Sequence, residues 1–206
     1  IGGGIYHSQN LEGALSTLPG ARIVYPSFAD DAAGLLRTSM RSKGFTLFLE
    51  PKALYNSLDA ACVVPDDFEV PFGKARIRRS GSDLTIITYG NTTHLCLKVA
   101  ERLANDKVAN CEVIDLRSLI PLDKETIFES VKKTSKVLIV HEDKVFSGFG
   151  AELAATIGTE LFQHLDAPIQ RVGSIFTPVG FHPVLEKAIL PDADRIYKAA
   201  SDLLAY

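Results

Sequence analysis

Short apolar runs alternate with segments of helical spacing along most of the chain, which is the pattern of a parallel sheet covered by helices. In the first part we predict a helix over residues 8–18, with Leu11, Leu15 and Leu18 on its apolar face, and strands over 22–26 and 46–50. Between the strands, Ser27 and Asp30 are spaced like a capping box at the start of a second helix. The first part therefore reads as half of an α/β domain.

The alternation resumes after residue 83. We predict strands over 84–89, 111–116, 136–141 and 168–172, and helices over 93–105, 124–133, 150–165, 183–190 and 193–204. Residues 57–82 contain prolines and glycines and keep neither period, which is typical of an interdomain crossing. We therefore expect a partial domain over 1–56, a crossing over 57–82 and a doubly wound domain over 83–206. The basic run Arg76–Arg79 is interpreted as solvated surface.

Composition and charge remove several classes of function. The formal net charge of -3 provides no broad positive field for a nucleic-acid backbone. The three cysteines are widely spaced and form no CxxC pair, which argues against a disulfide framework or a zinc site. No apolar run approaches the ~20 residues that cross a bilayer, and no signal peptide is present, so we predict a cytoplasmic protein. Because three glycines open the chain without a preceding element, we expect it to begin partway through a domain.

Ligands of open parallel sheets bind beyond the carboxyl ends of the strands, so the loops there are the candidate sites. One loop runs from His141, Glu142 and Asp143 to a glycine turn at residues 147–150, and the others are Gly90-Asn91-Thr92 and Asp115-Leu116-Arg117. The first loop has the residues to bind a metal or a phosphate at a helix N-terminus. However, adjacent strand residues point to opposite faces, so His141 and Glu142 cannot both ligate one ion. We favour glycines that let a helix pack closely, and we predict no metal site.

The histidines differ in what they are expected to do. His7 follows the glycines and precedes Ser8, a candidate N-cap, and its imidazole can exchange a proton at neutral pH. A structural histidine bonded to a carbonyl is an equally good interpretation of His7. His94, His164 and His182 are interpreted as core or surface residues. The serine-hydrolase, phosphate-loop and zinc-protease motifs are missing from the sequence.

Several motifs in a fixed order point to one family. They are Tyr6-His7-Ser8-Gln9, Val24-Tyr25-Pro26-Ser27, the run from Phe48 to Lys52, the run from Val113 to Pro121, His141-Glu142-Asp143 and the run from Gly148 to Glu152. Together they resemble the beta subunit of the thiamine-diphosphate-dependent dehydrogenase component of 2-oxo acid dehydrogenase complexes. The resemblance covers essentially the whole chain. It implies an α/β fold, the C-terminal part of a thiamine-binding pyrimidine domain followed by a doubly wound transketolase C-terminal domain.

The resemblance also implies a reaction. Family members decarboxylate a 2-oxo acid on thiamine diphosphate and transfer the acyl group to lipoamide. Carried onto this sequence, the family's active-site histidine is His7, which would position the lipoyl group and protonate the departing sulfur. The family's other contacts to thiamine diphosphate and magnesium lie on segments that do not match this chain. No cofactor-binding residue is therefore assigned, and the chain alone is expected to be inactive and to bind neither group.

The same resemblance implies partners, and it leaves alternatives open. The partners would be an alpha subunit or fused alpha domain and the dihydrolipoyl acyltransferase core, in a homodimer or heterotetramer. Pyruvate, branched-chain 2-oxo acids and acetoin all remain as substrates. A non-catalytic assembly module that docks the acyltransferase core is one alternative, and a transketolase or deoxyxylulose phosphate synthase fragment is another. The turn at residues 42–45 departs from the family pattern where some members hold a monovalent cation, which argues against that ion here.

Overall fold

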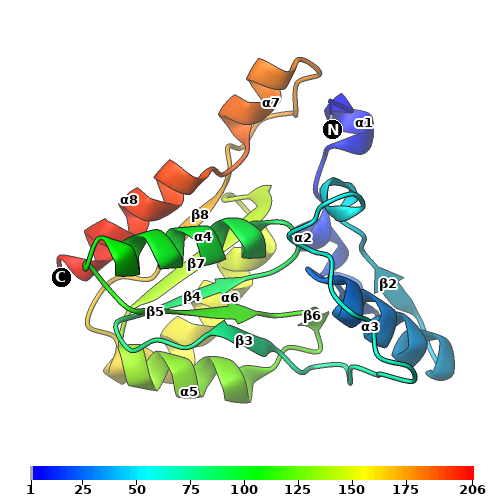
Figure 1. Ribbon diagram of the computed structural model, residues 1–206, viewed down its shortest axis with the longest axis horizontal. Helices are drawn as coiled ribbons and strands as arrows, with labels where there is room; N and C mark the ends of the chain where they lie inside the picture. The colour runs from blue at the N-terminus through cyan, green and yellow to red at the C-terminus, as the bar shows by residue number, and fades with distance from the viewer. Residues whose placement is uncertain (1) are drawn as a thin grey trace.

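The structure is a computed structural model that describes residues 2–206. The first part of the chain forms short helices and two short strands. Its elements are α1 (Gly4–His7), α2 (Glu12–Leu15), β1 (Arg22–Val24), α3 (Ala29–Arg41), β2 (Thr46–Phe48) and the 3-10 turn η1 (Lys52–Leu54). A long irregular segment then leads into the larger part of the molecule (Figure 1).

The larger part is a doubly wound α/β unit, which confirms the predicted fold class. Its sheet has the order β3-β5-β4-β7-β8, and every neighbouring pair is parallel except β3 with β5. The strands are β3 (Arg76–Arg79), β4 (Leu84–Thr88), β5 (Cys111–Asp115), β7 (Val137–Lys144) and β8 (Gln170–Ser174). The helices are α4 (Thr92–Asn105), α5 (Lys124–Thr134), α6 (Phe149–Leu161), α7 (Pro183–Ile189) and α8 (Ala193–Leu204), with η2 (Phe162–His164) after α6.

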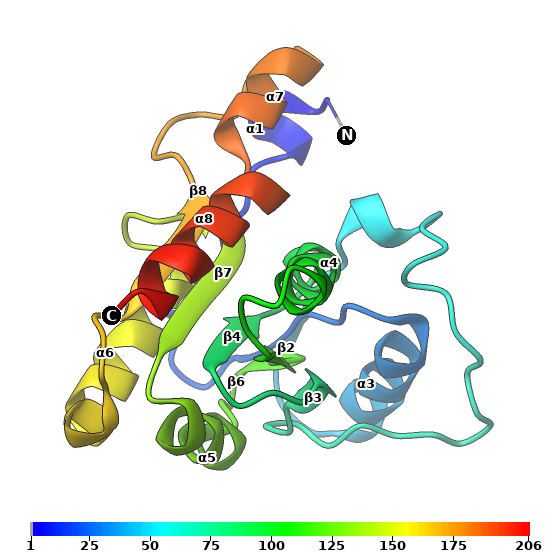
Figure 2. The ribbon, with the colours of Figure 1, turned by 60° about the vertical axis from the view of Figure 1, so that its left-hand side comes forward.

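Helices cover both faces of this sheet, and each face has its own apolar core. On one face, residues of α4 and α8 such as Val99 and Ile196 pack on the strands. On the other face, residues of α5 and α6 such as Ile127 and Leu153 do the same (Figure 2). All five residues of β4 are buried, including Thr85 and Thr88, as expected for a central strand that is covered on both faces.

The two parts of the chain share a second, smaller sheet of order β2-β1-β6. Its third strand, β6 (Ser118–Ile120), comes from the larger part and pairs antiparallel with β1, placing Ser118 opposite Val24. The sequence pattern did not predict β6 or the strand β3. The domain limits 1–56, 57–82 and 83–206 stay a prediction, although β3 lies in the predicted crossing and pairs with the larger sheet.

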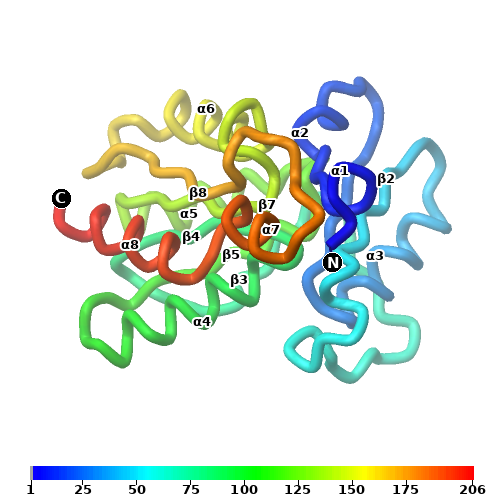
Figure 3. The backbone as a smooth tube through the Cα atoms, turned by 90° about the horizontal axis from the view of Figure 1, so that it is seen from above, coloured from blue at the N-terminus to red at the C-terminus, as the bar shows by residue number. Residues whose placement is uncertain are grey.

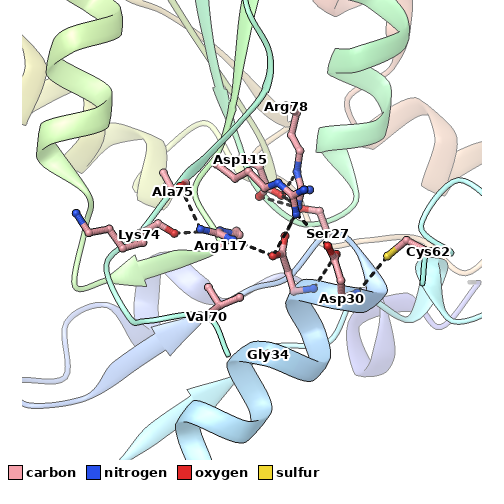
Figure 4. A network of polar contacts seen from close by, with 12 residues as sticks. Ser27, Asp30, Gly34, Cys62, Val70, Lys74, Ala75, Arg78, Asp115 and Arg117 are labelled. Atoms are coloured by element: carbon pink, nitrogen blue, oxygen red, sulfur yellow. Dashed lines mark hydrogen bonds and ion pairs between the residues drawn. The ribbon is translucent and has the colours of Figure 1, made fainter. Parts of the chain in front are cut away.

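A buried ionic network corrects two sequence predictions (Figure 4). Arg78 is not solvated surface, because its side chain is only 8% exposed and forms ion pairs with Asp31 on α3 and Asp115 on β5. Arg117 also contacts Asp31, with 2.8 Å between Nη1 and Oδ1. Ser27 does not cap α3 with its side chain. Its hydroxyl instead donates to Asp115 at 3.0 Å, so tertiary partners replace the predicted capping box.

The first predicted helix is much shorter than its apolar spacing indicated. The α2 helix is a single turn that buries Glu12 and Gly13, whereas Leu11 and Leu18 are 52% and 46% exposed. Ser8 ends α1 and does not begin α2, and its hydroxyl accepts a hydrogen bond from the Gly3 amide at 3.0 Å. Glu12 and Gly13 are buried because α2 packs against Asp143 and the backbone of Ser147 and Gly148, and Leu15 packs partly on the apolar core. Within residues 2–206, none of the helices has the length and apolar character needed to cross a membrane.

Candidate active-site groove

A groove of about 400 Å³ lies where the first part of the chain meets the carboxyl ends of β4 and β7. Residues from α1, α2, the end of β2 and η1 form one side, and residues that follow β4 and lie near the end of β7 form the other. In Figure 3, which views the molecule from above, α1 lies beside α7 at this end. The groove therefore occupies the edge of the sheet at which ligands of doubly wound folds bind.

His7 is the exposed imidazole of this groove. It is the last residue of α1, a helix of four residues that begins at Gly4, where φ is +56°. Gly4 is also closely packed, since a Cβ there would lie 2.6 Å from the ring of Phe181. The amide of Gly2 donates to the carboxylate of Glu186 on α7 at 3.1 Å. These contacts hold α1 against α7 and so place His7 on the groove wall.

Asn91, which follows β4, and Glu142, near the carboxyl end of β7, both line the groove, as the strand-end rule predicted. Asn91 at the start of α4 donates from Nδ2 to Oε1 of Glu142 at 2.9 Å, which bridges the ends of the two strands. Burial raises the pKa of Glu142, and the hydrogen bond from Asn91 opposes that rise. The neighbouring His141 faces away from the groove into the core, so the two residues point to opposite sides as predicted.

Glu12 is a buried carboxyl group that also lines the groove. It is 1% exposed, and its pKa is raised to about 7, first by burial and then by the negative charge of Asp143. Asn10 donates to Glu12 from Nδ2 at 3.4 Å. Sequence reasoning missed this residue because helical periodicity assigns a glutamate between Leu11 and Leu15 to the solvent side. The adjacent Gly13 is a signal that a close contact exists on that face.

Three glycines enclose the imidazole of His141. A Cβ on Gly150 would lie 2.2 Å from its Nε2, and Cβ atoms on Gly148 and Gly173 would lie 3.0 and 3.1 Å from its Cε1. The ring is stacked parallel to that of Tyr89, with centroids 6.1 Å apart. Burial lowers the pKa of His141 to about 4, so the ring is neutral at physiological pH. The prediction that the glycines at residues 147–150 permit close helix packing is confirmed. The absence of a metal site stays a prediction, although no cluster of acidic, histidine or cysteine side chains among residues 2–206 suits a metal ion.

Replacing Gly150 with alanine is expected to lower the free energy of unfolding by about 1–3 kcal/mol, because the new methyl group overlaps a ring that cannot move aside. Gly158→Ala in the same helix is the matched control, since the nearest atom to its Cβ is 3.9 Å away. This control is expected to gain about 0.5–1 kcal/mol from helix propensity. Denaturant unfolding measures both changes, and a Gly150 variant as stable as the Gly158 variant would contradict the packing argument.

The remaining candidates have structural positions. Asp115 and Arg117, predicted at a strand end, belong to the buried ionic network and not to the groove. His94 is buried, and its Nε2 lies 2.7 Å from the carbonyl oxygen of Ser27. His164 is exposed at the end of η2, and His182 accepts a hydrogen bond from the Val184 amide as the N-cap of α7. These positions agree with the core or surface interpretation.

Known proteins similar to this chain are beta subunits of dehydrogenases. The chain is 43% identical to the mitochondrial 2-oxoisovalerate dehydrogenase subunit beta of Dictyostelium discoideum over 99% of its length. It is 42% identical to the pyruvate dehydrogenase E1 component subunit beta of Rickettsia felis over 97%, and 39% identical to the 2-oxoisovalerate dehydrogenase subunit beta of Bacillus subtilis over 100%. The chain spans 54–63% of the length of these three relatives.

Solved structures and a family match agree with the fold. A split gene transketolase, described as an inactive beta4 tetramer, superposes with a TM-score of 0.76 over 94% of this chain and 60% of its own, at 22% identity. A transketolase from Pichia stipitis superposes with a TM-score of 0.63 over 98% of this chain and 28% of its own, at 12% identity. Residues 73–196 match the family described as transketolase, C-terminal domain. The chain therefore belongs to the transketolase C-terminal domain family.

Proposed function

We propose that this chain is part of a thiamine-diphosphate-dependent 2-oxo acid dehydrogenase that decarboxylates a 2-oxo acid and transfers the acyl group to lipoamide. The observation that carries the proposal is the groove with the His7 imidazole on its wall, in a chain similar over 97–100% of its length to the three beta subunits named above. The transketolases are similar at 22% identity or less, which supports a shared fold only. An oxidative decarboxylation is therefore favoured over ketol transfer.

The groove residues do not fit the diphosphate and magnesium of the cofactor. Glu50, Glu142 and Glu186 line the groove together with Lys52, and this excess of carboxyl groups does not favour an anionic diphosphate. Among the described residues, no cluster of acidic, histidine or cysteine side chains suits the magnesium ion either. We propose that an alpha subunit or fused alpha domain supplies these contacts, while this chain supplies one wall of the site.

The role proposed for His7 is to donate a proton. The substrate carbon that has lost carbon dioxide carries an electron pair and attacks one sulfur of the lipoyl dithiolane. The new C–S bond forms as the S–S bond breaks, so the carbon is oxidised to the acyl level and the second sulfur departs as a thiolate. An imidazolium has a suitable pKa to protonate that sulfur near neutral pH. His7 is exposed on the groove wall, as an acceptor arriving on a dihydrolipoyl acyltransferase partner requires. Its neighbours Ser8, Gln9 and Asn10 line the same groove and are placed to orient the acceptor.

A substrate panel tests the proposal directly. The complete enzyme is expected to release carbon dioxide from pyruvate or a branched-chain 2-oxo acid and to reduce lipoamide, in a reaction that requires added thiamine diphosphate and magnesium. Sugar phosphates that donate a ketol group serve as the comparison substrates. Turnover of the sugar phosphates without turnover of any 2-oxo acid would replace this proposal with the transketolase alternative.

A further inference from the structure

The α2 helix rests directly on the turn between β7 and α6. The Gly13 amide donates to Oδ2 of Asp143 at 2.9 Å in a buried hydrogen bond. A Cβ on Gly13 would lie 2.8 Å from the Ser147 carbonyl oxygen and 2.9 Å from the Cα of Gly148, so the two backbones are in close contact. Glu12, the residue before Gly13, is 1% exposed, and the charge of the same Asp143 acts on it. We call this contact between α2 and the β7–α6 turn the seat of α2. Because only a few residues separate α2 from His7, the seat constrains where the His7 imidazole lies.

The charges that face Glu12 are unfavourable to a second anion. Asp143 and Glu142 on β7 both act on it with negative charge. Lys144 is also on β7, but its ammonium group lies 3.3 Å from Oδ1 of Asp143 and 2.6 Å from the Asn10 carbonyl oxygen. No lysine, arginine or histidine of residues 2–206 forms an ion pair with Glu12, whose hydrogen bond comes from the neutral amide of Asn10. An ionised Glu12 would therefore face two carboxylates without a cation of its own.

Two tyrosine hydroxyls complete the surroundings of Glu12. Tyr25 follows β1 and Tyr89 follows β4, and for both residues burial and then the charge of Glu12 raise the pKa. Tyr89 is only 2% exposed, and its hydroxyl lies beside Glu12 without a hydrogen bond of good geometry in the described chain. A protonated carboxyl group offers such neighbours both a donor and an acceptor. The surroundings therefore suit an uncharged acid better than a carboxylate.

We propose that Glu12 is a positioning residue, which as an uncharged carboxylic acid keeps α2 seated on the β7–α6 turn and thereby fixes His7 in the groove. Ionisation of Glu12 places a further negative charge beside Asp143 and Glu142 and weakens that seat. The seat itself is a property of the fold, whereas its importance for catalysis rests on the proposed function of His7.

The sign of the pH dependence follows from linkage. The pKa of Glu12 in the seated state is about 7, and the ordinary value is 4.5. Below pH 4.5 Glu12 is protonated whether α2 is seated or detached, so seating requires no uptake of a proton. Between pH 4.5 and about 7 the unseated state loses its proton first, and seating weakens by up to tenfold per pH unit. Above about 7 both states are ionised and the effect is constant.

Hydrogen exchange of residues 4–15 in the complete enzyme measures the seat. After correction for intrinsic exchange rates, protection in the unmodified enzyme is expected to fall about fortyfold from pH 5 to pH 7 and to level off above pH 7. Glu12→Gln keeps the shape without the titration, so its protection should stay high throughout. Glu101→Gln, which removes an exposed negative charge from α4, should follow the unmodified enzyme.

A second variant tests whether the charge of Asp143 sets the pH at which Glu12 ionises. Asp143→Asn keeps an acceptor oxygen but removes the charge beside Glu12, so the loss of protection should level off at a lower pH and be smaller in total. Equal pH dependence in Glu12→Gln and the unmodified enzyme, or no transition in the unmodified enzyme, would overturn the inference. If exchange behaves as expected while lipoyl-dependent turnover is insensitive to His7, the proposed function fails and the seating role of Glu12 stands.

Discussion

Replacing His7 with alanine is expected to reduce lipoyl-dependent turnover of the complete enzyme by about 100- to 10,000-fold, the usual cost of removing a positioned acid. Decarboxylation followed with an artificial electron acceptor should fall much less, because no sulfur has to be protonated in that assay. His7 is exposed at the end of α1 and is absent from both large apolar cores, so folding should survive the change. The pair of assays therefore separates acyl transfer from decarboxylation.

The control for this substitution is His164→Ala. His164 is exposed at the end of η2 and does not line the groove, so its removal should leave both assays unchanged. Equal losses in the two assays for His7→Ala would remove the assigned role in acyl transfer. If neither assay changes, His7 returns to the structural interpretation that the sequence also allowed.

The second large effect is expected at Asp31, the fully buried acid of the ionic network. Arg117 and Arg78 both contact its carboxylate, and the side chains of these arginines are only 10% and 8% exposed. Asp31→Ala leaves Arg117 without a carboxylate partner in the described chain and leaves Arg78 with Asp115 only. Removing one member of a buried ionic group typically costs about 3–5 kcal/mol, because the remaining charge stays buried without compensation.

Denaturant unfolding of the chain tests this expectation. The matched control is Asp202→Ala, which breaks the exposed pair between Lys198 and Asp202 on α8. An exposed pair of this kind contributes about 1 kcal/mol or less. If Asp31→Ala destabilises the chain no more than Asp202→Ala does, then the network does not stabilise the contact between α3 and the larger sheet.

The central part of the fold could be predicted from sequence because its strands are buried on both faces. All five residues of β4 and of β5 are buried, so each strand appears as a compact apolar or mostly apolar run. The edge strand β3 could not be predicted, because three of its four residues are arginines. Arg78 is buried only because Asp31 and Asp115 meet it, and both lie far from it in the sequence. The spacing of apolar residues near β3 therefore cannot predict that Asp31 and Asp115 contact Arg78.

The groove could be predicted in part. The strand-end rule identified Asn91 and Glu142, because it depends only on where β4 and β7 end. His7 came from the family resemblance, since a glycine-rich segment has no period from which its direction can be inferred. Glu12 could not be predicted, because its burial depends on Asp143 and on the backbone of Ser147 and Gly148, which lie far from it in the sequence.

The pairing of β6 with β1 affects the order in which the two sheets can fold during synthesis. β1 is translated early, but one of its edges pairs with Ser118 and Ile120 of β6. These residues follow β3, β4 and β5 of the larger sheet in the sequence. Until those residues leave the ribosome, that edge of β1 has only solvent or another chain to bind. The small sheet therefore cannot close until residue 120 has been made, and the larger sheet is completed later still, by β7 and β8. Chaperones should therefore bind mainly while the ribosome translates residues 24 to 118.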